Sequence, residues 1–302
     1  MNTMVYHIPA LLPQALESLN IKPEGTYADV TFGGGGHSRA IIEQIGPEGH
    51  LYGFDRDTEA AARAIDDPRF TMVLSNFRYI ANFLRFYDAG ELDGLLADLG
   101  VSFHHFDSAE RGFSFRMNGP LDMRMNLNAR LTAAKVVNDY DEQRLADILY
   151  LYGELKTARR IANAIVKARA LKPIETTDQL AAIVEPLINP RQQRKEMAQI
   201  FQALRIEVNG EMEALAELLT ASTSVLKPGG RLVIITYHSL EDRMVKNFMR
   251  TGNLNGTDNK DFFGRSLSPF KLITSSPIVP DDEEIENNPR SRSAKMRVAE
   301  KI

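Results

Sequence analysis

The chain has 302 residues, of which 43% are hydrophobic and 25% are charged, a composition typical of a folded and packed protein. It contains no cysteine, which excludes disulfides, cysteine-ligated zinc and cysteine nucleophiles. No apolar run reaches the length of a membrane span, and no basic segment followed by an apolar core opens the chain. We therefore expect a cytoplasmic protein with no membrane contact.

The net charge of −4 is unevenly distributed along the chain. Residues 108–200 hold 15 basic and 11 acidic residues, a net of +4, which leaves −8 for the remainder. A stretch within this part carries six basic residues with no acid between them: Lys156, Arg159, Arg160, Lys167, Arg169 and Lys172. This stretch is either a solvated helix face or a surface for a polyanion such as nucleic acid.

The first predicted strand, residues 27–32, meets four consecutive glycines, and a helical pattern begins at about Ser38. A strand, a glycine turn and a helix N-terminus together bring backbone N–H groups close to a ligand. The next predicted strand, residues 50–54, is followed by Asp55, where a carboxylate can accept hydrogen bonds from two ribose hydroxyls. The two elements predict a site for an adenosine-containing cofactor.

The glycine pattern favours S-adenosylmethionine over a phosphate-bearing cofactor. Ser38 stands where a dinucleotide site has its third glycine, and the chain has no G-x-x-x-x-G-K-[ST] motif. Asp29 in the first strand, the short turn and Asp55 suit a ligand whose carboxylate lies at the glycines and whose ribose lies on Asp55. The alternatives are a tight strand–helix turn with a surface aspartate, or a dinucleotide-dependent dehydrogenase.

Two further predicted strands, residues 70–74 and 92–96, also end in candidate site residues. Phe77 follows the first of them and either flanks an adenine ring or belongs to the core. Asp98 follows the second, at the end where ligands bind in such sheets, and acts in the site or caps a helix. Alternating strands and helices predict a doubly wound parallel α/β sheet.

The fifth predicted strand, residues 231–236, comes more than a hundred residues after the fourth, although a crossover needs only a few dozen. Most of the excess is helical in pattern, over 133–138, 142–150, 155–170 and 177–184. We therefore expect an inserted all-α domain at 108–195, with residues 1–107 and 196–302 forming the sheet domain. A helix over about 196–226 would complete the crossover, and strands at 270–274 and 295–299 would end the chain.

Seven segments resemble the motifs of a known family. They are Thr31-Phe32-Gly33 with Gly35-Gly36-His37-Ser38; Asp55-Arg56-Asp57; Asp98-Leu99-Gly100-Val101-Ser102; Ala109-Glu110-Arg111-Gly112-Phe113-Ser114-Phe115; Gly119-Pro120-Leu121-Asp122-Met123-Arg124-Met125; His238-Ser239-Leu240-Glu241-Asp242-Arg243; and Asn288-Pro289-Arg290-Ser291-Arg292-Ser293. In order and spacing, the chain closely resembles the RsmH (MraW) family of bacterial 16S rRNA (cytosine-1402-N4)-methyltransferases over nearly its whole length.

The resemblance implies a class I methyltransferase fold, a Rossmann-like doubly wound sheet, with a helical insert that helps to hold RNA. It implies S-adenosylmethionine as cofactor and 16S rRNA of the small ribosomal subunit as partner. The cofactor residues carried over by position are Gly35, Gly36, His37, Asp55, Phe77, Asp98 and His105. Around His105 the sequence Ser-Phe-His-His departs from the Ser-Pro-Gln that is commoner in the family. A methyltransferase with another acceptor, and a non-catalytic RNA-binding protein, are the alternatives.

The absence of cysteine bears on the reaction, because methylation of pyrimidine C5 normally needs a cysteine nucleophile, whereas an exocyclic amine needs only orientation. We expect Asp98 either to accept an N4 proton or to bind the amino group of the methionine moiety. His238, after the fifth predicted strand, either contacts the base or a phosphate, or is satisfied by backbone at a helix start. Its neighbour Tyr237 could stack on the base. No cluster has convincing metal-ligand spacing, so no metal is expected, and a homodimer is one option for assembly.

Overall fold

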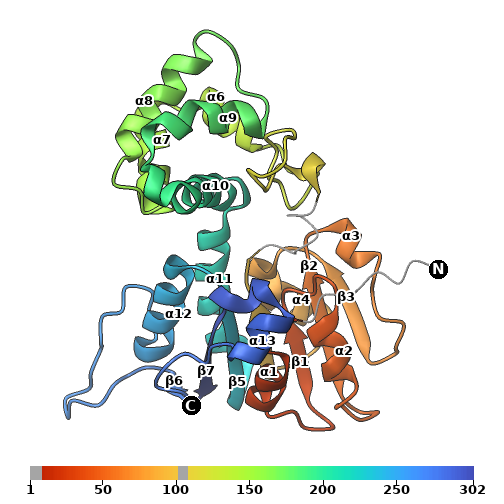
Figure 1. The fold of residues 1–302 in the computed structure, drawn as a ribbon. Coiled ribbons are helices and arrows are strands. Elements are labelled where there is room, and N and C mark those ends of the chain that lie inside the picture. Colours follow the sequence, from red (N-terminus) through yellow and green to blue (C-terminus); the bar gives the residue numbers. More distant parts are fainter. Residues whose placement is uncertain (1–8, 101–107) are drawn as a thin grey trace. The chain divides into compact units, whose positions relative to one another are not determined.

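The computed structural model describes residues 9–100 and 108–302, and the chain divides into two compact units (Figure 1). The sheet unit comprises Met1–Gly100 and Met212–Ile302, and the helical unit comprises Val101–Glu211. Each unit has its own apolar core. The two units are therefore described separately.

The sheet unit contains a seven-stranded sheet in the order β3-β2-β1-β4-β5-β7-β6. Its strands are β1 Thr26–Asp29, β2 His50–Asp55, β3 Phe70–Leu74, β4 Leu92–Asp98, β5 Leu226–Thr236, β6 Phe270–Leu272 and β7 Lys295–Lys301. Strands β1 to β5 run parallel to one another, whereas β7 is antiparallel to both β5 and β6. This confirms the predicted doubly wound α/β sheet. The order of the strands along the sheet reverses between β1 and β4, which is the point where such sheets bind ligands.

Helices cover both faces of this sheet. They are α1 Leu12–Leu19, α2 Gly36–Ile42, α3 Thr58–Ala61, α4 Ile80–Phe86, α11 Glu211–Val225, α12 Ser239–Thr251 and α13 Asp282–Asn287. Successive strand residues point to opposite faces, so Leu95 of β4 enters the core cluster shared with α4, α11 and α12, while Leu96 enters the cluster shared with α1 and α2. Burial on both faces explains why these strands are apolar almost throughout.

The helical unit is built from α6 Ala133–Asp139, α7 Glu142–Leu151, α8 Ala158–Arg169, α9 Thr177–Val184 and α10 Gln193–Asn209. Short 3₁₀ helices of the chain lie at Phe77–Tyr79, Ala109–Arg111, Glu185–Leu187, Pro190–Gln192 and Pro289–Ser293. The sequence predicts an insert from 108 to 195, whereas the compact helical unit runs to Glu211. The difference arises because α10 packs Ile200 and Leu204 into the core of the helical unit.

The prediction of one crossover helix over about 196–226 was wrong. The helix α10 ends at Asn209, because Gly210 adopts a left-handed conformation with φ of 57° and its N–H bonds back to the carbonyls of Ile206 and Glu207. Glycine takes this conformation without the steric cost that a Cβ brings. A second helix, α11, then begins at Glu211. No helix in the described part of the chain is long and apolar enough to cross a membrane.

Candidate active site

The glycine turn joins the end of β1 to the first turn of α2, which begins at Gly36, two residues before the predicted start. Gly33 and Gly35 have φ values of 52° and 76°, in the left-handed region. A Cβ at Gly35 would lie 2.7 Å from a ring carbon of Phe32, and one at Gly36 would lie 2.5 Å from the ring of Pro9. Gly35 is therefore needed for steric reasons and for backbone conformation, and Gly36 for steric reasons alone.

Asp55 connects the end of β2 to the glycine turn. Its Oδ2 accepts the Gly33 N–H at 2.8 Å and its Oδ1 accepts the Asp57 N–H at 2.9 Å. Burial raises the pKa of Asp55, and these two N–H groups oppose the rise. Because each carboxylate oxygen has two lone pairs, Asp55 retains acceptor capacity for the hydroxyls of a ligand.

Asp29, at the end of β1, is the most deeply buried carboxylate of this edge, with 1% exposure. It accepts a hydrogen bond from Ser38 Oγ at 2.6 Å and from the Thr31 N–H at 3.1 Å. Burial raises its pKa to about 6, while the bonds from Ser38 and Thr31 act in the opposite direction. Asp29 thus fixes both ends of the glycine turn, a role that only its long-range partners reveal.

Asp98 ends β4 and is held by residues from three other segments. Its Oδ1 accepts the Tyr237 hydroxyl at 2.8 Å, its Oδ2 lies 3.8 Å from His37 Nδ1, and its N–H donates to Thr31 Oγ1 at 2.6 Å. Burial raises its pKa to about 6, and His37 and Tyr237 oppose the rise. The side chain stays 20% exposed, so a ligand can reach it.

Two neighbours of Asp98 have their own protonation states fixed by burial. Burial, followed by the nearby Asp98 charge, raises the pKa of Tyr237 well above its usual value, so its hydroxyl remains a donor. Burial lowers the pKa of His37, and the charge of Asp98 opposes this. His37 Nε2 lies 3.2 Å from the Ala10 carbonyl, which can only accept, so this contact is a hydrogen bond when the ring carries a proton on Nε2.

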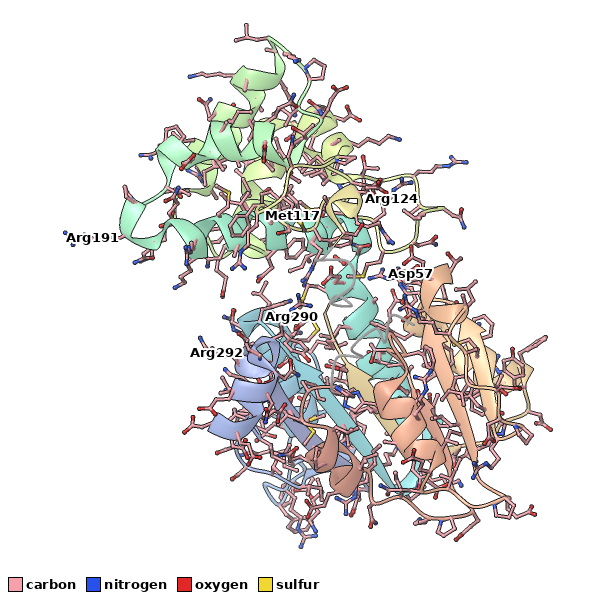
Figure 2. All side chains as sticks on the ribbon, turned by 45° about the vertical axis from the view of Figure 1, so that its right-hand side comes forward. Asp57, Met117, Arg124, Arg191, Arg290 and Arg292 are labelled. Carbon is pink, nitrogen blue, oxygen red and sulfur yellow. The ribbon has the colours of Figure 1, made fainter. Side chains whose placement is uncertain are left out.

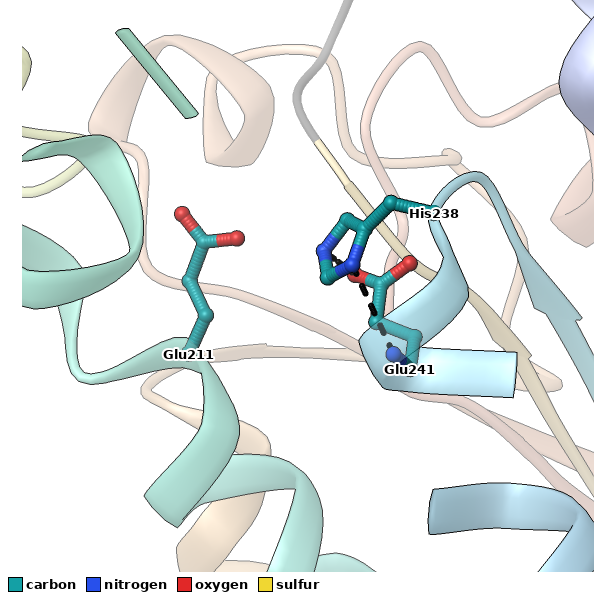
Figure 3. Close-up of side chains that lie close together, drawn as sticks. All are labelled: Glu211, His238 and Glu241. Atoms are coloured by element: carbon teal, nitrogen blue, oxygen red, sulfur yellow. Dashed lines mark hydrogen bonds and ion pairs between the residues drawn. The ribbon is translucent and has the colours of Figure 1, made fainter. Parts of the chain in front are cut away.

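His238 is the N-cap of α12, and both of its ring nitrogens face Glu241 (Figure 3). Its Nδ1 accepts the Glu241 N–H at 3.5 Å, and its Nε2 lies 3.1 Å from Glu241 Oε1. The other oxygen of Glu241 accepts the Tyr237 N–H at 3.0 Å. His238 thus occupies a helix start and is bonded to its backbone, which is one of the two roles predicted for it, and its side chain is 9% exposed.

Two further predicted residues, Phe77 and His105, are not among the side chains that surround Asp98 in the described structure. Phe77 begins a 3₁₀ helix after β3, is half-buried, and packs against the core cluster of α4 and β2. His105 lies outside the described residues. The structure therefore brings Asp29, Asp55, Asp98 and His238 to one edge, where parallel β1, β2, β4 and β5 end.

Comparison with known proteins shows which family this chain belongs to. The model of the MraW methylase family matches residues 4–302. The chain belongs to the MraW methylase family. This membership confirms the resemblance seen in the sequence, together with the predicted methyltransferase activity and S-adenosylmethionine as cofactor.

Curated relatives are similar to this methylase over nearly its whole length. Ribosomal RNA small subunit methyltransferase H of Bacteroides fragilis is 61% identical over 296 residues, which are 98% of this chain and 97% of the relative. The proteins of the same name from Bacteroides thetaiotaomicron and Porphyromonas gingivalis are 59% and 54% identical, each over 99% of this chain and 98% and 97% of the relatives. The MraW methylase and these relatives therefore match over nearly the full length of both.

Proposed function

We propose that this MraW-family methylase transfers the methyl group of S-adenosylmethionine to the exocyclic N4 amine of cytidine 1402 in 16S rRNA of the small ribosomal subunit. The observation that carries the proposal is the end-to-end match to relatives named ribosomal RNA small subunit methyltransferase H, at 61% identity in the first of them. A cytoplasmic location, where ribosomal subunits are found, is part of the proposal.

The chain's own residues fit the cofactor. The glycine turn, with Gly35 and Gly36 bare of side chains, lets backbone N–H groups approach the methionine carboxylate, next to His37. Asp55, with its free lone pairs, would hold the ribose hydroxyls, and Phe77 would lie against the adenine. When bound, S-adenosylmethionine supplies a methyl group activated by the positive sulfur.

Asp98 has the properties of a proton acceptor beside the methyl group. With a pKa of about 6 it is mostly ionised at pH 7, and the Tyr237 hydroxyl orients it through Oδ1. A carboxylate that accepts an N4 proton turns the amine lone pair towards the methyl carbon, and alignment of this kind contributes much of the rate. Binding of the methionine amino group is the alternative role. We assign His238 to the same step as a contact to the base or to a phosphate.

The helical unit would hold the RNA, which extends the role expected for residues 108–195. Arg160 donates to the Leu187 carbonyl and Arg169 to the Val137 carbonyl, so these two cations are used within the unit. Lys156, Arg159 and Lys167 are exposed, and the described residues give none of them an ion pair. Exposed cations without carboxylate partners are suited to phosphates.

The test combines methyl-labelled S-adenosylmethionine with unmodified small subunits and, in parallel, with naked 16S rRNA. Nucleosides from the product RNA are separated and identified by mass spectrometry. Label in N4-methylcytidine, mapped to position 1402 by fragment analysis, is the expected result. Saturable cofactor binding without label in either RNA would contradict the proposal and leave a methyltransferase with another acceptor.

A further inference from the structure

The sheet unit has a polar cavity between helix α12 and the β6–β7 edge of the sheet. Its volume is about 240 Å³, enough for several water molecules. It is lined by Lys246, Arg250, Leu272, Thr274, Ser275 and Arg297. These are three cations, two hydroxyls and one apolar side chain, with no carboxylate, which is the composition of an anion site.

The charge of this pocket is only partly balanced by its surroundings. Arg297 Nε donates to Asp242 Oδ1 at 2.6 Å, and Lys295 Nζ lies 3.8 Å from the other oxygen, so one acid faces two bases. Lys246 and Arg250 are exposed on successive turns of α12, and the described residues give Lys246 no ion pair. The pocket therefore carries a net positive charge.

The hydroxyls point to a ligand with several acceptor oxygens. Thr274 Oγ1 is shielded from solvent and has no hydrogen-bond partner in the described part of the chain. A buried hydroxyl left unpaired costs free energy, and an acceptor brought into the pocket offers it a partner. Ser275 lies next to it on the same wall. A phosphate group provides acceptors for the hydroxyls and a negative charge for the cations.

The segment that connects α12 to β6 favours RNA as the source of the phosphate. It carries Phe262 and Phe263, which are 97% and 79% exposed, and the Arg265 guanidinium lies 5.8 Å from the Phe263 ring. Asp261 Oδ1 fixes this tip by accepting the N–H groups of Phe263 and Arg265, both at 2.8 Å. Exposed aromatic rings beside cations are the chemistry with which proteins stack unpaired bases.

We propose that the α12–β6 pocket binds a backbone phosphate of the rRNA, as a contact separate from the helical unit and from the edge that holds Asp98. The proposal rests on the proposed function, because it takes RNA as the substrate. Lys246 and Arg250 would make the main contacts. Arg250 stands in the last turn of α12, where a cation also suits the helix dipole, so the folding of its variants must be checked.

The test measures the dissociation constant of the full-length protein for unmodified small subunits by filter binding at a series of salt concentrations. We expect the double variant Lys246→Ala/Arg250→Ala to bind about three- to tenfold more weakly, because the two cations that contact the phosphate are lost. The slope of log affinity against log salt should fall by about 0.7, the value for one single-strand phosphate. The charge-retaining Lys246→Arg/Arg250→Lys should restore most of the affinity.

Arg85→Ala, at an exposed position of α4, is the control for loss of a surface cation. S-adenosylmethionine affinity and the melting temperature show that each variant is folded. The proposal is overturned if the double alanine variant binds subunits as tightly as Arg85→Ala does. It is also overturned if the charge-retaining variant binds subunits as weakly as the double alanine variant does. Failure of the proposed function is seen separately, as absence of methyl transfer by the unaltered protein.

A second arm separates RNA from free phosphate. Inorganic phosphate is titrated into the protein while the amide signals of Thr274 and Ser275 are followed by NMR. If phosphate shifts these signals while the double alanine variant keeps its affinity for subunits, the pocket takes free phosphate and the RNA proposal is wrong. Weak phosphate binding together with the loss of subunit affinity supports it.

Discussion

The carboxyl edge of the sheet and the core of the helical unit are both buried, but they are filled by opposite kinds of side chain. At the edge, Asp29, His37 and Ser38 are at most 4% exposed. In the helical unit, the core cluster is apolar, with residues such as Leu149 and Ile161 fully buried. Burying a carboxylate costs free energy even when it is hydrogen-bonded, whereas burying leucine stabilises the fold.

The difference shows which region is built for stability and which for a ligand. The helical core gains from every buried methylene. The edge holds its donors and acceptors in fixed positions at a cost in stability, and such fixed groups bind or catalyse without reorganising. Changes at the edge should therefore affect activity more than folding, and changes in the helical core should do the reverse.

The largest expected effect is at Asp98. Asp98→Asn keeps the shape and the bond from Tyr237 but removes the proton acceptor, so turnover should fall roughly 10²- to 10⁴-fold while cofactor affinity is retained. Methyl transfer to small subunits and calorimetric titration of S-adenosylmethionine measure the two quantities, with the exposed Asp88→Asn as control. Equal losses of binding and turnover would reject the acceptor role and favour contact with the methionine amino group.

The reverse behaviour is expected in the helical core. Leu149 and Leu151 both lie on α7, but Leu149 is fully buried and Leu151 is 57% exposed. Leu149→Ala should lower the free energy of unfolding by about 2–5 kcal/mol, because it leaves a cavity, and Leu151→Ala should change it by less than about 0.5 kcal/mol. Urea unfolding of both variants tests this, and similar costs for the two would contradict the assigned core.

The free-energy cost of burying carboxylates at this edge should be visible in the pH dependence of the protein's stability. Burial raises the pKa of Asp29 from 3.8 to about 6, so the folded protein binds this proton more tightly than the unfolded chain. The stabilisation that comes from this tighter proton binding at Asp29 is complete below pH 3.8, and it is lost as the pH rises through 6. The free energy lost is about 3 kcal/mol, since one pKa unit is about 1.4 kcal/mol.

Asp29→Asn removes this titration. Relative to the unaltered protein, the variant should therefore become more stable as the pH rises from 4 to 7, whatever its stability at either end. Urea unfolding at several pH values gives the difference, and comparison with Asp88→Asn corrects for an exposed site. A difference that stays constant over this range would show that Asp29 does not titrate there.

The smallest effect is expected on the exterior of the helical unit. Replacing Lys156, Arg159 and Lys167 together by alanine should weaken binding to small subunits by about tenfold and lower its salt dependence, because phosphate contacts are lost. Cofactor affinity, measured across the same salt series, should stay nearly flat. Subunit binding that is insensitive to salt in the unaltered protein would remove the RNA-holding role from this unit.

Local patterns predicted the elements of both regions well. The strands at 50–54 and 70–74 and the helix at 177–184 match β2, β3 and α9 to within one residue. Apolar runs between turn residues carry this information, and Asp55 followed from its spacing to the glycines. Gly210 was overlooked, because a single glycine inside a helical pattern is tolerated in many helices.

Local sequence patterns did not predict contacts between residues that lie far apart in the chain. The sequence offered Tyr237 as a residue that could stack on the base, but it did not indicate that the Tyr237 hydroxyl donates to Asp98, 139 residues away. The depth at which Asp29 lies, and hence its raised pKa, depends on α2 closing over β1 through Ser38. Burial and contacts of this kind follow from the assembled sheet, and no local pattern contains them.

The division of the chain into one continuous and one interrupted unit also fixes the order in which they can form during translation. The helical unit is a single stretch that ends at Glu211, so all its contacts exist once that residue has left the ribosome. The sheet must wait, because Leu95 of β4 pairs with Leu232 of β5, and synthesis of the chain between them takes on the order of ten seconds. During that interval β4 is an open sheet edge, which exposes the nascent chain to mispairing until β5 arrives.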